Sequence, residues 1–348
     1  MTTEILPDPD LFVYMYVRKE AVLSSQIEGT QASLIDILEY EARAREDGPT
    51  QDILEVIDYM AAMDHGLKRL EQWPVSLRLL KEIHARLLKH SRGHERNPGE
   101  FRRSQNWIGP QGCTLTDALF VPPPHHAMLS ALGDLETFIH NSRPMPPLIK
   151  LGLIHAQFET IHPFLDGNGR IGRLLITFLL CKNEILRKPL LYLSYYFKRH
   201  RAEYYDRLQA IRDQGRWEEW LKFFLKGVFE VSQGATGVAR QIMRLREKDH
   251  EMIVDRMGKG AGTALVLLES LYGTPYISVQ GAAAATELTA ANANNLVNKL
   301  CGHGILEEYT GQKRNRHFVY KAYVSLFEEA PEATAGDAIE PSSSGREG

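Results

Sequence analysis

The sequence is poor in cysteine and has no long apolar run. Its 348 residues include three cysteines, Cys113, Cys181 and Cys301, which lie far apart and form no CxxC pair. This argues against a disulfide framework or a structural zinc site and favours a reducing compartment. No segment approaches the roughly 18 apolar residues of a membrane span, and the N-terminus lacks the basic then apolar layout of a signal peptide. We therefore expect a cytoplasmic protein with no membrane partner.

A large excess of one charge is also missing. The net charge of −3 excludes a globally basic nucleic-acid-binding protein, although it allows a local basic patch. With 43% hydrophobic and 24% charged residues, the composition is typical of a globular protein. The length allows one well-buried core and two or three domains.

Several common catalytic motifs are absent as well. The sequence has neither an HExxH metalloprotease motif nor a GxxxxGK[ST] phosphate loop. The spacing of Gly167–Gly172 matches GxGxxG, but the residues before it have helical periodicity and end in a proline, whereas a dinucleotide-binding site needs a preceding strand. The HxxxH pattern at His90–His94 lies in a polar, arginine-rich stretch and indicates an exposed surface.

Helical periodicity dominates the rest of the first 246 residues. Apolar residues recur at helical spacing, and Ser33 with Asp36 is typical of a helix start. By contrast, Pro98–Pro124 is rich in glycine, proline and aromatic residues, which predicts a hairpin or a long functional loop. The predicted helices are Leu11–Ser25, one starting at Ser33, one starting at Pro49, Leu77–Leu88, His126–His140, Leu148–Thr160, Ile171–Lys182, Ala202–Arg212 and Trp217–Arg246.

From about Gly258 the pattern changes to three short helices and two strands, the order of a winged helix-turn-helix. The tail has almost no large apolar residues, which predicts disorder. The predicted helices are Thr263–Leu271, Gln280–Leu288 and Ala290–Gly302, and the strands are Ile305–Tyr309 and His317–Lys321. The predicted domains are an N-terminal helical segment (1–48), a catalytic domain (49–246), the winged helix-turn-helix (258–327) and the tail (328–348).

The predicted winged helix-turn-helix is weakly basic, with five basic and three acidic residues between Ala282 and Lys321. Its third helix, Ala290–Gly302, carries four asparagines, which can contact bases or phosphates. DNA binding and protein docking are both open. The basic residues are Lys299, Lys313, Arg314, Arg316 and Lys321, and the acidic residues are Glu287, Glu307 and Glu308. The asparagines are Asn292, Asn294, Asn295 and Asn298.

The loop HPFLDGNGRIGR at His162–Arg173 carries the strongest chemical signal. Gly167 and Gly169 flank Asn168, so backbone N–H groups can converge at a tight turn. The helix that follows points its positive end at the same place, and Arg170 and Arg173 project from one side of its first turn. These features together predict a phosphate-binding site.

Two further residues of this loop make the site reactive. A carboxylate at Asp166 would repel phosphate unless a divalent cation lies between them, and Mg²⁺ suits that position. His162 is within one loop's reach and can act as a base near neutral pH. Base, metal ligand and phosphate cradle thus lie within twelve residues.

The loop closely resembles the Fic family signature HPFx[D/E]GNGRxxR, with every fixed position matched. The resemblance implies a mainly α fold, a Fic-type helical bundle with a small β-hairpin flap, here followed by the winged helix-turn-helix. It also implies transfer of AMP from ATP to a Tyr, Ser or Thr hydroxyl of a target protein. His162 would deprotonate the hydroxyl, and Asp166 would hold Mg²⁺. Asn168 with the Gly167 and Gly169 amides would stabilise the α-phosphate, and Arg170 and Arg173 would hold the outer phosphates.

The family likeness extends to three other features. Residues 109–124 resemble the flap, which holds the target segment by strand addition, and Tyr204 is the candidate adenine contact. Ser24 and Glu28 fit the inhibitory pattern [S/T]xxxE[G/N], in which the glutamate pairs with the second arginine of the motif, here Arg173. The likeness thus implies an adenylyltransferase that is inhibited by its own N-terminal helix.

The alternative function is a nucleotide-sensing, DNA-binding regulator with a Fic-like core, although a mere sensor would not need the base His162. Some relatives dimerise, modify themselves or use the inhibitory glutamate to remove AMP. The sequence names neither the target protein nor the signal that relieves inhibition.

Overall fold

The computed structural model describes residues 10–42, 48–91, 95–109, 112–141, 144–312 and 315–328. Three predictions lie partly or wholly outside these residues. They are the disordered tail beyond residue 328, the wing residues Lys313 and Arg314, and the second half of the HxxxH pattern.

Most of the described chain is α-helical, as the periodicity predicts. Ser33 caps α3 through a capping box with Asp36, and Thr50 and Ser76 cap the next two helices, each through its side-chain oxygen. The helices of the N-terminal and central parts are α2 (Asp10–Ile27), α3 (Leu34–Glu41), α4 (Gln51–Leu70), α5 (Leu77–Leu87), α6 (His125–His140), α7 (Pro147–Ile161), α8 (Asn168–Lys182), α9 (Ser194–Arg199), α10 (Arg201–Gln214) and α11 (Trp217–Met257).

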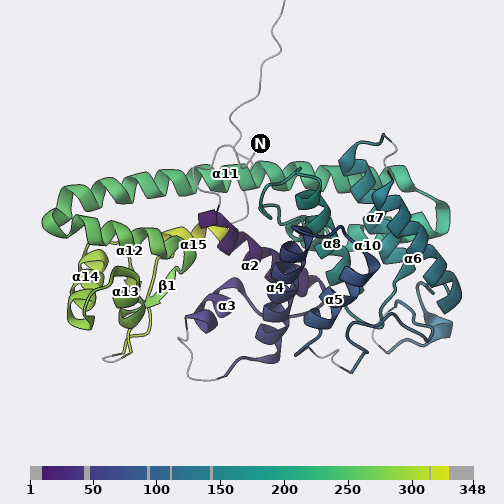
Figure 1. Cartoon of the computed structure of the whole chain (residues 1–348), viewed down its shortest axis with the longest axis horizontal. Coiled ribbons are helices and arrows are strands. Elements are labelled where there is room, and N and C mark those ends of the chain that lie inside the picture. Colours follow the sequence, from purple (N-terminus) through teal and green to yellow (C-terminus); the bar gives the residue numbers. More distant parts are fainter. Residues whose placement is uncertain are drawn as a thin grey trace, which may run out of the picture.

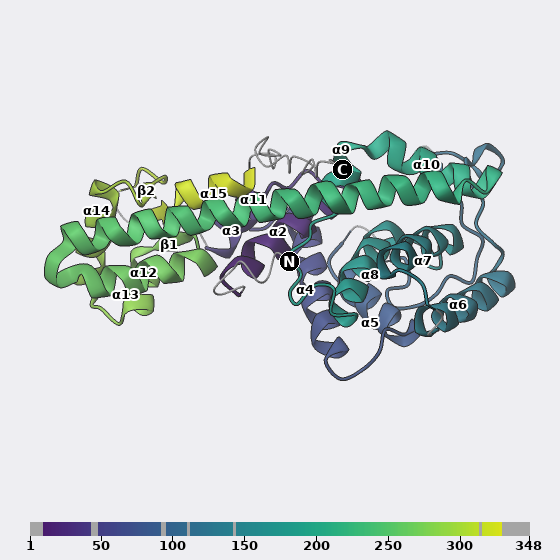
Figure 2. The same ribbon diagram turned by 90° about the horizontal axis from the view of Figure 1, so that it is seen from above.

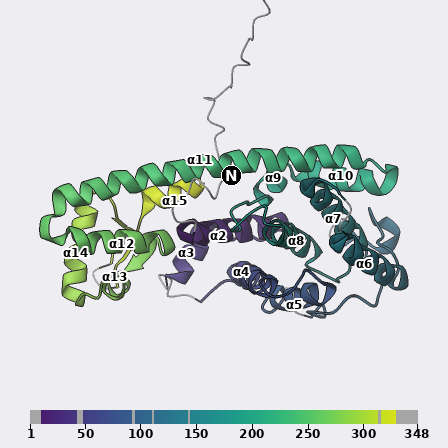
Figure 3. The same cartoon turned by 45° about the horizontal axis from the view of Figure 1, so that its top comes forward.

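The long helix α11 runs along one side of the whole molecule (Figure 1). Helices α4 to α10 gather at one of its ends, and the C-terminal elements gather at the other (Figure 2). Helix α2 lies between these two groups, where it packs against α4 and α9 on one side and α12 on the other. Figure 3 shows α8 beside α2 in this central region. The N-terminal helix is therefore part of the core.

Close helix packing brings α7 and α8 into the centre of the larger group. A Cβ atom on Gly66 of α4 would lie only 2.2 Å from the ring of Phe178, so glycine lets α8 approach α4 closely. On the other side, the indole of Trp220 donates to the Gly152 carbonyl, which fastens α7 to α11. These contacts fix the loop that joins α7 to α8.

The C-terminal part comprises the 3₁₀ turn η2 (Gly258–Gly260), α12 (Ala261–Gly273), β1 (Tyr276–Ser278), α13 (Val279–Thr286), α14 (Ala290–Gly302), β2 (Glu307–Glu308), β3 (His317–Val319) and α15 (Lys321–Glu328). Its antiparallel sheet has the order β1-β3-β2, with Ile277 opposite Phe318 and Glu307 opposite Val319. The predicted order of helices followed by a hairpin is found. The assignment as a winged helix-turn-helix stays a prediction.

Several elements differ from the sequence-based prediction. Helix α11 continues eleven residues past Arg246, because Asp249 and Ile253 are buried on the same face. Helices α9 and α15 and strand β1 were not predicted. The predicted flap hairpin is a long loop with the 3₁₀ turn η1 (Leu115–Asp117) and an isolated antiparallel bridge between Ile108 and Phe120. Among the described residues, no helix is long and apolar enough to cross a membrane.

Candidate active site

His162 follows the last residue of α7 in a left-handed conformation, with φ 48° and ψ 62°. This backbone turn sends the chain into the loop that leads to α8. Burial, together with the positive charge of Arg212, lowers the pKa of His162 to about 4. The imidazole is therefore neutral at physiological pH and can accept a proton.

The N-terminus of α8 forms the floor of the site. Gly167, the N-cap residue, has φ 75°, which glycine adopts at low cost, and because glycine has no side chain it offers no cap to the helix N–H groups. The Asn168 amide accepts from the Phe164 N–H at 2.9 Å and donates to the Phe164 carbonyl at 2.8 Å. Its side chain thus holds the loop closed, and its direct contact with phosphate stays a prediction.

Arg170 is 5% exposed, and its buried Nε and Nη1 atoms have no hydrogen-bond partner among the described residues. The Nη2 atom lies 3.7 Å from Oδ1 of Asp166. Buried guanidinium donors are rarely left unpaired, because desolvation without a partner is costly. Together with the uncapped N-terminus of α8, they form an anion seat.

Asp166 lies at the edge of this seat, and its side chain is 43% exposed. Its Oδ1 accepts from the Gly167 N–H at 2.6 Å, while its backbone carbonyl faces Nε2 of His84 at 3.0 Å. No group of three or more His, Cys, Asp or Glu side chains among the described residues could hold a metal by itself. A single exposed carboxylate nevertheless fits Mg²⁺, which proteins often bind together with the phosphates of a nucleotide.

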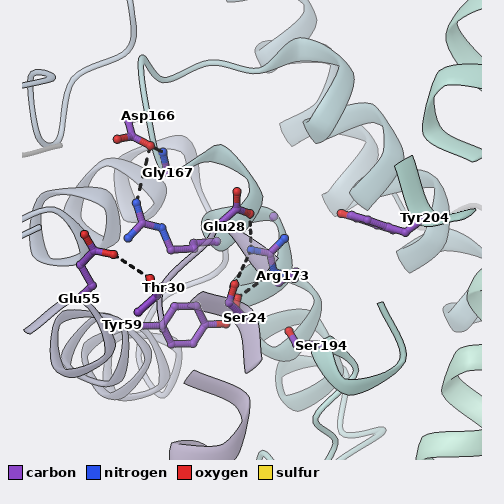
Figure 4. A network of polar contacts seen from close by, with 12 residues as sticks. Ser24, Glu28, Thr30, Glu55, Tyr59, Asp166, Gly167, Arg173, Ser194 and Tyr204 are labelled. Carbon is purple, nitrogen blue, oxygen red and sulfur yellow. Dashed lines mark hydrogen bonds and ion pairs between the residues drawn. The ribbon is translucent and has the colours of Figure 1, made fainter. Parts of the chain in front are cut away.

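Arg173 is 2% exposed and is held by the end of α2 (Figure 4). Its Nε donates to the Ser24 hydroxyl at 2.8 Å, and its Nη2 donates to the Ser24 carbonyl at 3.0 Å and to Oε1 of Glu28 at 2.6 Å. The structure therefore brings together the predicted pair of inhibitory residues and the second arginine of the motif.

The Glu28 carboxylate lies directly over the start of α8. A Cβ atom on Gly169 would be 2.3 Å from Oε1 of Glu28 and 3.1 Å from Nη1 of Arg173. Burial alone would raise the pKa of Glu28, but the charge and hydrogen bond of Arg173 hold it below its ordinary value. Glu28 is therefore an ionised carboxylate at the position where the helix end attracts an anion.

A buried polar cluster supports α2 behind this contact. Glu20 is 4% exposed and accepts from the Ser194 N–H at 3.2 Å and from its hydroxyl at 2.5 Å, and the Tyr59 hydroxyl donates to it at 3.3 Å. Burial raises the pKa of Glu20 to about 7. Just beyond Gly29, which has φ 104°, the Thr30 hydroxyl donates to Glu55 of α4 at 2.8 Å.

Tyr204 is 1% exposed, and its hydroxyl lies 2.9 Å from Nε2 of His155. In Figure 4 it stands well apart from Glu28 and Arg173. Its neighbour Tyr205 is 40% exposed, and the charges of Glu28 and Arg173 influence the pKa of both tyrosines. An adenine contact by Tyr204 stays a prediction, and the exposed ring on this turn of α10 belongs to Tyr205.

Sequence reasoning missed the residues that support the motif loop from outside. The His84 ring stacks on Phe164 with centroids 3.8 Å apart. Arg102 and Asn106 donate to carbonyl groups at the end of α7 and in the loop. In the sequence both residues lie in the segment FRRSQN. Its composition predicted only a hairpin or long loop and gave no sign that these two side chains support the motif.

In the C-terminal part, Asn292, Asn295, Asn298 and Lys299 are exposed on α14. Arg316 is already paired with Glu308 at 2.7 Å and donates to Asn298 at 3.0 Å, and Lys321 pairs with Glu307 at 3.1 Å. These pairs reduce the positive charge that is available for DNA.

The fold and the motif loop are those of one protein family. Residues 1–68 match the model described as Fic/DOC family N-terminal, and residues 74–180 match that of the Fic/DOC family. The chain therefore belongs to the Fic/DOC family.

Curated relatives share part of the chain. A probable protein adenylyltransferase from Aquifex aeolicus is 27% identical over 157 residues, which cover 43% of this chain and 40% of the relative. The protein adenylyltransferase Fic from Aedes aegypti is 30% identical over 208 residues, which cover 55% of this chain and 38% of the relative. The match thus spans about two-fifths of the length of these relatives.

The whole arrangement also resembles a solved structure. A Fic family protein from Desulfovibrio desulfuricans G20 superposes with a TM-score of 0.55 at 21% identity. The superposition covers 88% of this chain and 86% of that protein. At this identity the likeness supports the fold alone.

Proposed function

We propose that this protein transfers AMP from ATP to a hydroxyl side chain of a target protein and is inhibited by Glu28. The observation that carries this proposal is the combination of a neutral, buried histidine and an anion seat on either side of one short loop. The relatives named protein adenylyltransferase support it. The modified residue is a Tyr, Ser or Thr of a protein that the chain does not identify.

The chemistry follows from the positions of these groups. His162 accepts the proton of the target hydroxyl, whose oxygen forms a bond to the α-phosphorus of ATP. The bond from the α-phosphorus to the oxygen that bridges it to the β-phosphate breaks, and pyrophosphate leaves. Arg170, Arg173 and the α8 N–H groups stabilise the phosphate charge, so catalysis is mostly positioning and electrostatics. Mg²⁺ held by Asp166 and the phosphates would offset part of that charge.

Inhibition follows from competition for one arginine. Arg173 cannot hold the outer phosphates of ATP while its Nε and Nη2 atoms are bonded to Ser24 and Glu28. The Glu28 carboxylate also places a negative charge at the helix end that the phosphates would occupy, and like charges repel there. The native chain is thus an adenylyltransferase held in a low-activity state.

Intact mass spectrometry after incubation with ATP and Mg²⁺ tests the reaction type, with a cell extract supplying targets in a parallel labelling experiment. A mass gain that matches AMP, or label from α-³²P-ATP but not from γ-³²P-ATP, supports adenylylation. A gain that matches phosphate, or nucleotide binding without any covalent product in the Glu28→Gly variant, contradicts it. The self-labelling arm also reports self-modification.

A DNA-binding regulator remains the second candidate, and the exposed asparagines of α14 are the observation in its favour. Binding of the full chain to duplex DNA that falls steeply with salt would support it. DNA binding that does not change with salt concentration, or no DNA binding at all, favours a protein-docking role for the C-terminal part. Homodimer formation, which some relatives show, would be read in the same samples by sedimentation.

A further inference from the structure

Arg102 is a fully buried arginine that the mechanism above does not use. It is 0% exposed and lies in the segment before the flap, far from Arg170 and Arg173 in the sequence. All hydrogen bonds of its guanidinium within the described residues go to backbone carbonyls. A charged group in such a position must be satisfied by well-aligned acceptors, because its desolvation is costly.

The four carbonyl groups belong to three separate pieces of chain. Nε donates to the carbonyl of His162 at 2.9 Å, and Nη2 donates to that of Ile161 at 3.4 Å. Nη2 also donates to the carbonyl of Pro123, and Nη1 donates to that of Ser104 at 3.3 Å. One guanidinium therefore joins the end of α7 to Pro123 at the C-terminal end of the flap and to Ser104 in the segment before the flap.

The backbone of Arg102 and a neighbouring side chain complete the clamp. The Arg102 N–H donates to the Pro163 carbonyl at 2.9 Å. The Asn106 amide donates to the carbonyls of His162 at 3.3 Å and Phe164 at 2.9 Å. The side chains of Arg102 and Asn106 thus both donate to the carbonyl of His162. They fix the orientation of the peptide group between His162 and Pro163.

His162 needs such support because its backbone is unfavourable. A non-glycine residue with φ 48° lies in the strained left-handed region, and a residue before proline ordinarily takes an extended conformation. Strained conformations of this kind persist only when their surroundings hold them. Without the clamp, we expect the His162 backbone to relax and its imidazole to move away from the hydroxyl.

We propose that Arg102 is a positioning residue that holds His162 in its reactive orientation and couples that orientation to the flap. This inference rests on the proposed function, in which His162 is the base. Arg102 itself touches no reacting atom.

The test compares Arg102→Gln, Arg102→Lys and the matched control Arg103→Gln, all in a Glu28→Gly background that frees Arg173. Arg103 is the next residue and is exposed. We expect Arg102→Gln to lower kcat roughly ten- to a hundredfold, because small misplacements of a reacting group cost that much. The Kd for ATP should stay within about twofold of that of Arg103→Gln, and Arg102→Lys should recover part of kcat.

A second readout does not depend on AMP transfer. The groups whose charges act on His162 are Arg212, Glu28 and Arg102. In otherwise wild-type chains labelled with ¹³C-histidine, His162 should stay neutral down to about pH 5 in Arg103→Gln, because burial depresses its pKa. In Arg102→Gln the pKa should rise toward the ordinary 6.5 as the imidazole loosens.

Each outcome decides the proposal. Equal kcat and equal titration in the Arg102→Gln and Arg103→Gln variants would overturn it, as would loss of ATP binding in parallel with kcat. If Arg102→Gln does not fold, the kinetic measurements and the His162 titration are made on Arg102→Lys and Asn106→Ala instead. If the Glu28→Gly chain transfers no AMP, the proposed function fails, while the titration still decides whether Arg102 positions His162.

Discussion

Oε1 of Glu28 accepts a 2.6 Å hydrogen bond from Nη2 of Arg173, although 145 positions separate the two residues in the sequence. The arginine is buried and the glutamate side chain is 35% exposed. The pair therefore joins the N-terminal helix to the catalytic motif at a place that solvent and ligand can reach. Under the proposed inhibition, this geometry would let the exposed glutamate leave while the buried arginine stays in place.

Replacement of Glu28 by glycine should raise AMP transfer. Removal of the carboxylate frees Arg173 and clears the space above Gly169, so we expect an increase of roughly tenfold or more, equivalent to at least about 1.4 kcal/mol of relieved competition. Labelling by α-³²P-ATP measures it, and Glu71→Gly, an exposed acid at the end of α4, is the control. An unchanged or lower rate would show that the pair does not restrain the enzyme.

Ser24 and Ser25 offer a matched comparison on the same turn. Both are 0% exposed, but the Ser24 hydroxyl accepts from Nε of Arg173, whereas the Ser25 hydroxyl has no partner in the part of the chain that the structure describes. Ser24→Ala should therefore activate the enzyme partially, since a hydrogen bond to a charged group contributes about 1.5–3 kcal/mol. Ser25→Ala should leave the labelling rate unchanged. Equal rates for the two variants would contradict a role for Ser24 in holding Arg173.

Replacement of His162 by alanine should abolish labelling but preserve ATP binding. Loss of a general base typically costs about 10²–10⁴-fold in rate, while the anion seat on α8 is untouched. In the Glu28→Gly background, calorimetry should give the same ATP affinity with and without His162. The exposed histidine variant His126→Ala is the control. Loss of ATP binding would mean that His162 maintains the loop rather than the chemistry.

Glu20 should make the stability of the fold depend on pH. Folding raises the pKa of this acid from 4.5 to about 7, so its protonated form is favoured in the native state. Its contribution to stability is complete below pH 4.5 and is lost as the pH rises through 7. Glu20→Gln should remove that loss, worth about 3 kcal/mol.

Urea unfolding at pH 5 and pH 8 measures this effect. The difference in unfolding free energy between Glu20→Gln and the wild type should grow in favour of the variant at the higher pH, whereas Glu71→Gln should show no such growth. A constant difference would mean that the Glu20 carboxylate is well stabilised by Ser194 and Tyr59.

Much of the site could be predicted because its residues are close in sequence. The twelve residues His162–Arg173 contain the base, the turn and the helix start, and local geometry places them together. The capping box of Ser33 and Asp36 was likewise a local signal, and the structure contains it. The Glu28–Arg173 contact is long-range, and it followed from the family resemblance.

The rest could not be predicted because it depends on contacts across the fold. Arg102 clamps His162 from sixty positions away, and a single sequence gives no sign that a loop arginine will be fully buried. The short helix Ser194–Arg199 has too few residues for a clear periodicity. The 3₁₀ turn and bridge of the flap likewise depend on side chains of α10, such as Arg212, whose guanidinium lies 4.1 Å from the centre of the Phe120 ring.

The position of Glu28 ahead of the motif also sets an order of events during synthesis. The ribosome makes α2 first and reaches Arg173 only after 145 more residues, on the order of ten seconds later. When the last part of the anion seat emerges, the carboxylate that fills it already exists on the same nascent chain. Under the proposed inhibition, a newly made copy of this protein would already carry the inhibitory carboxylate when its motif loop is complete.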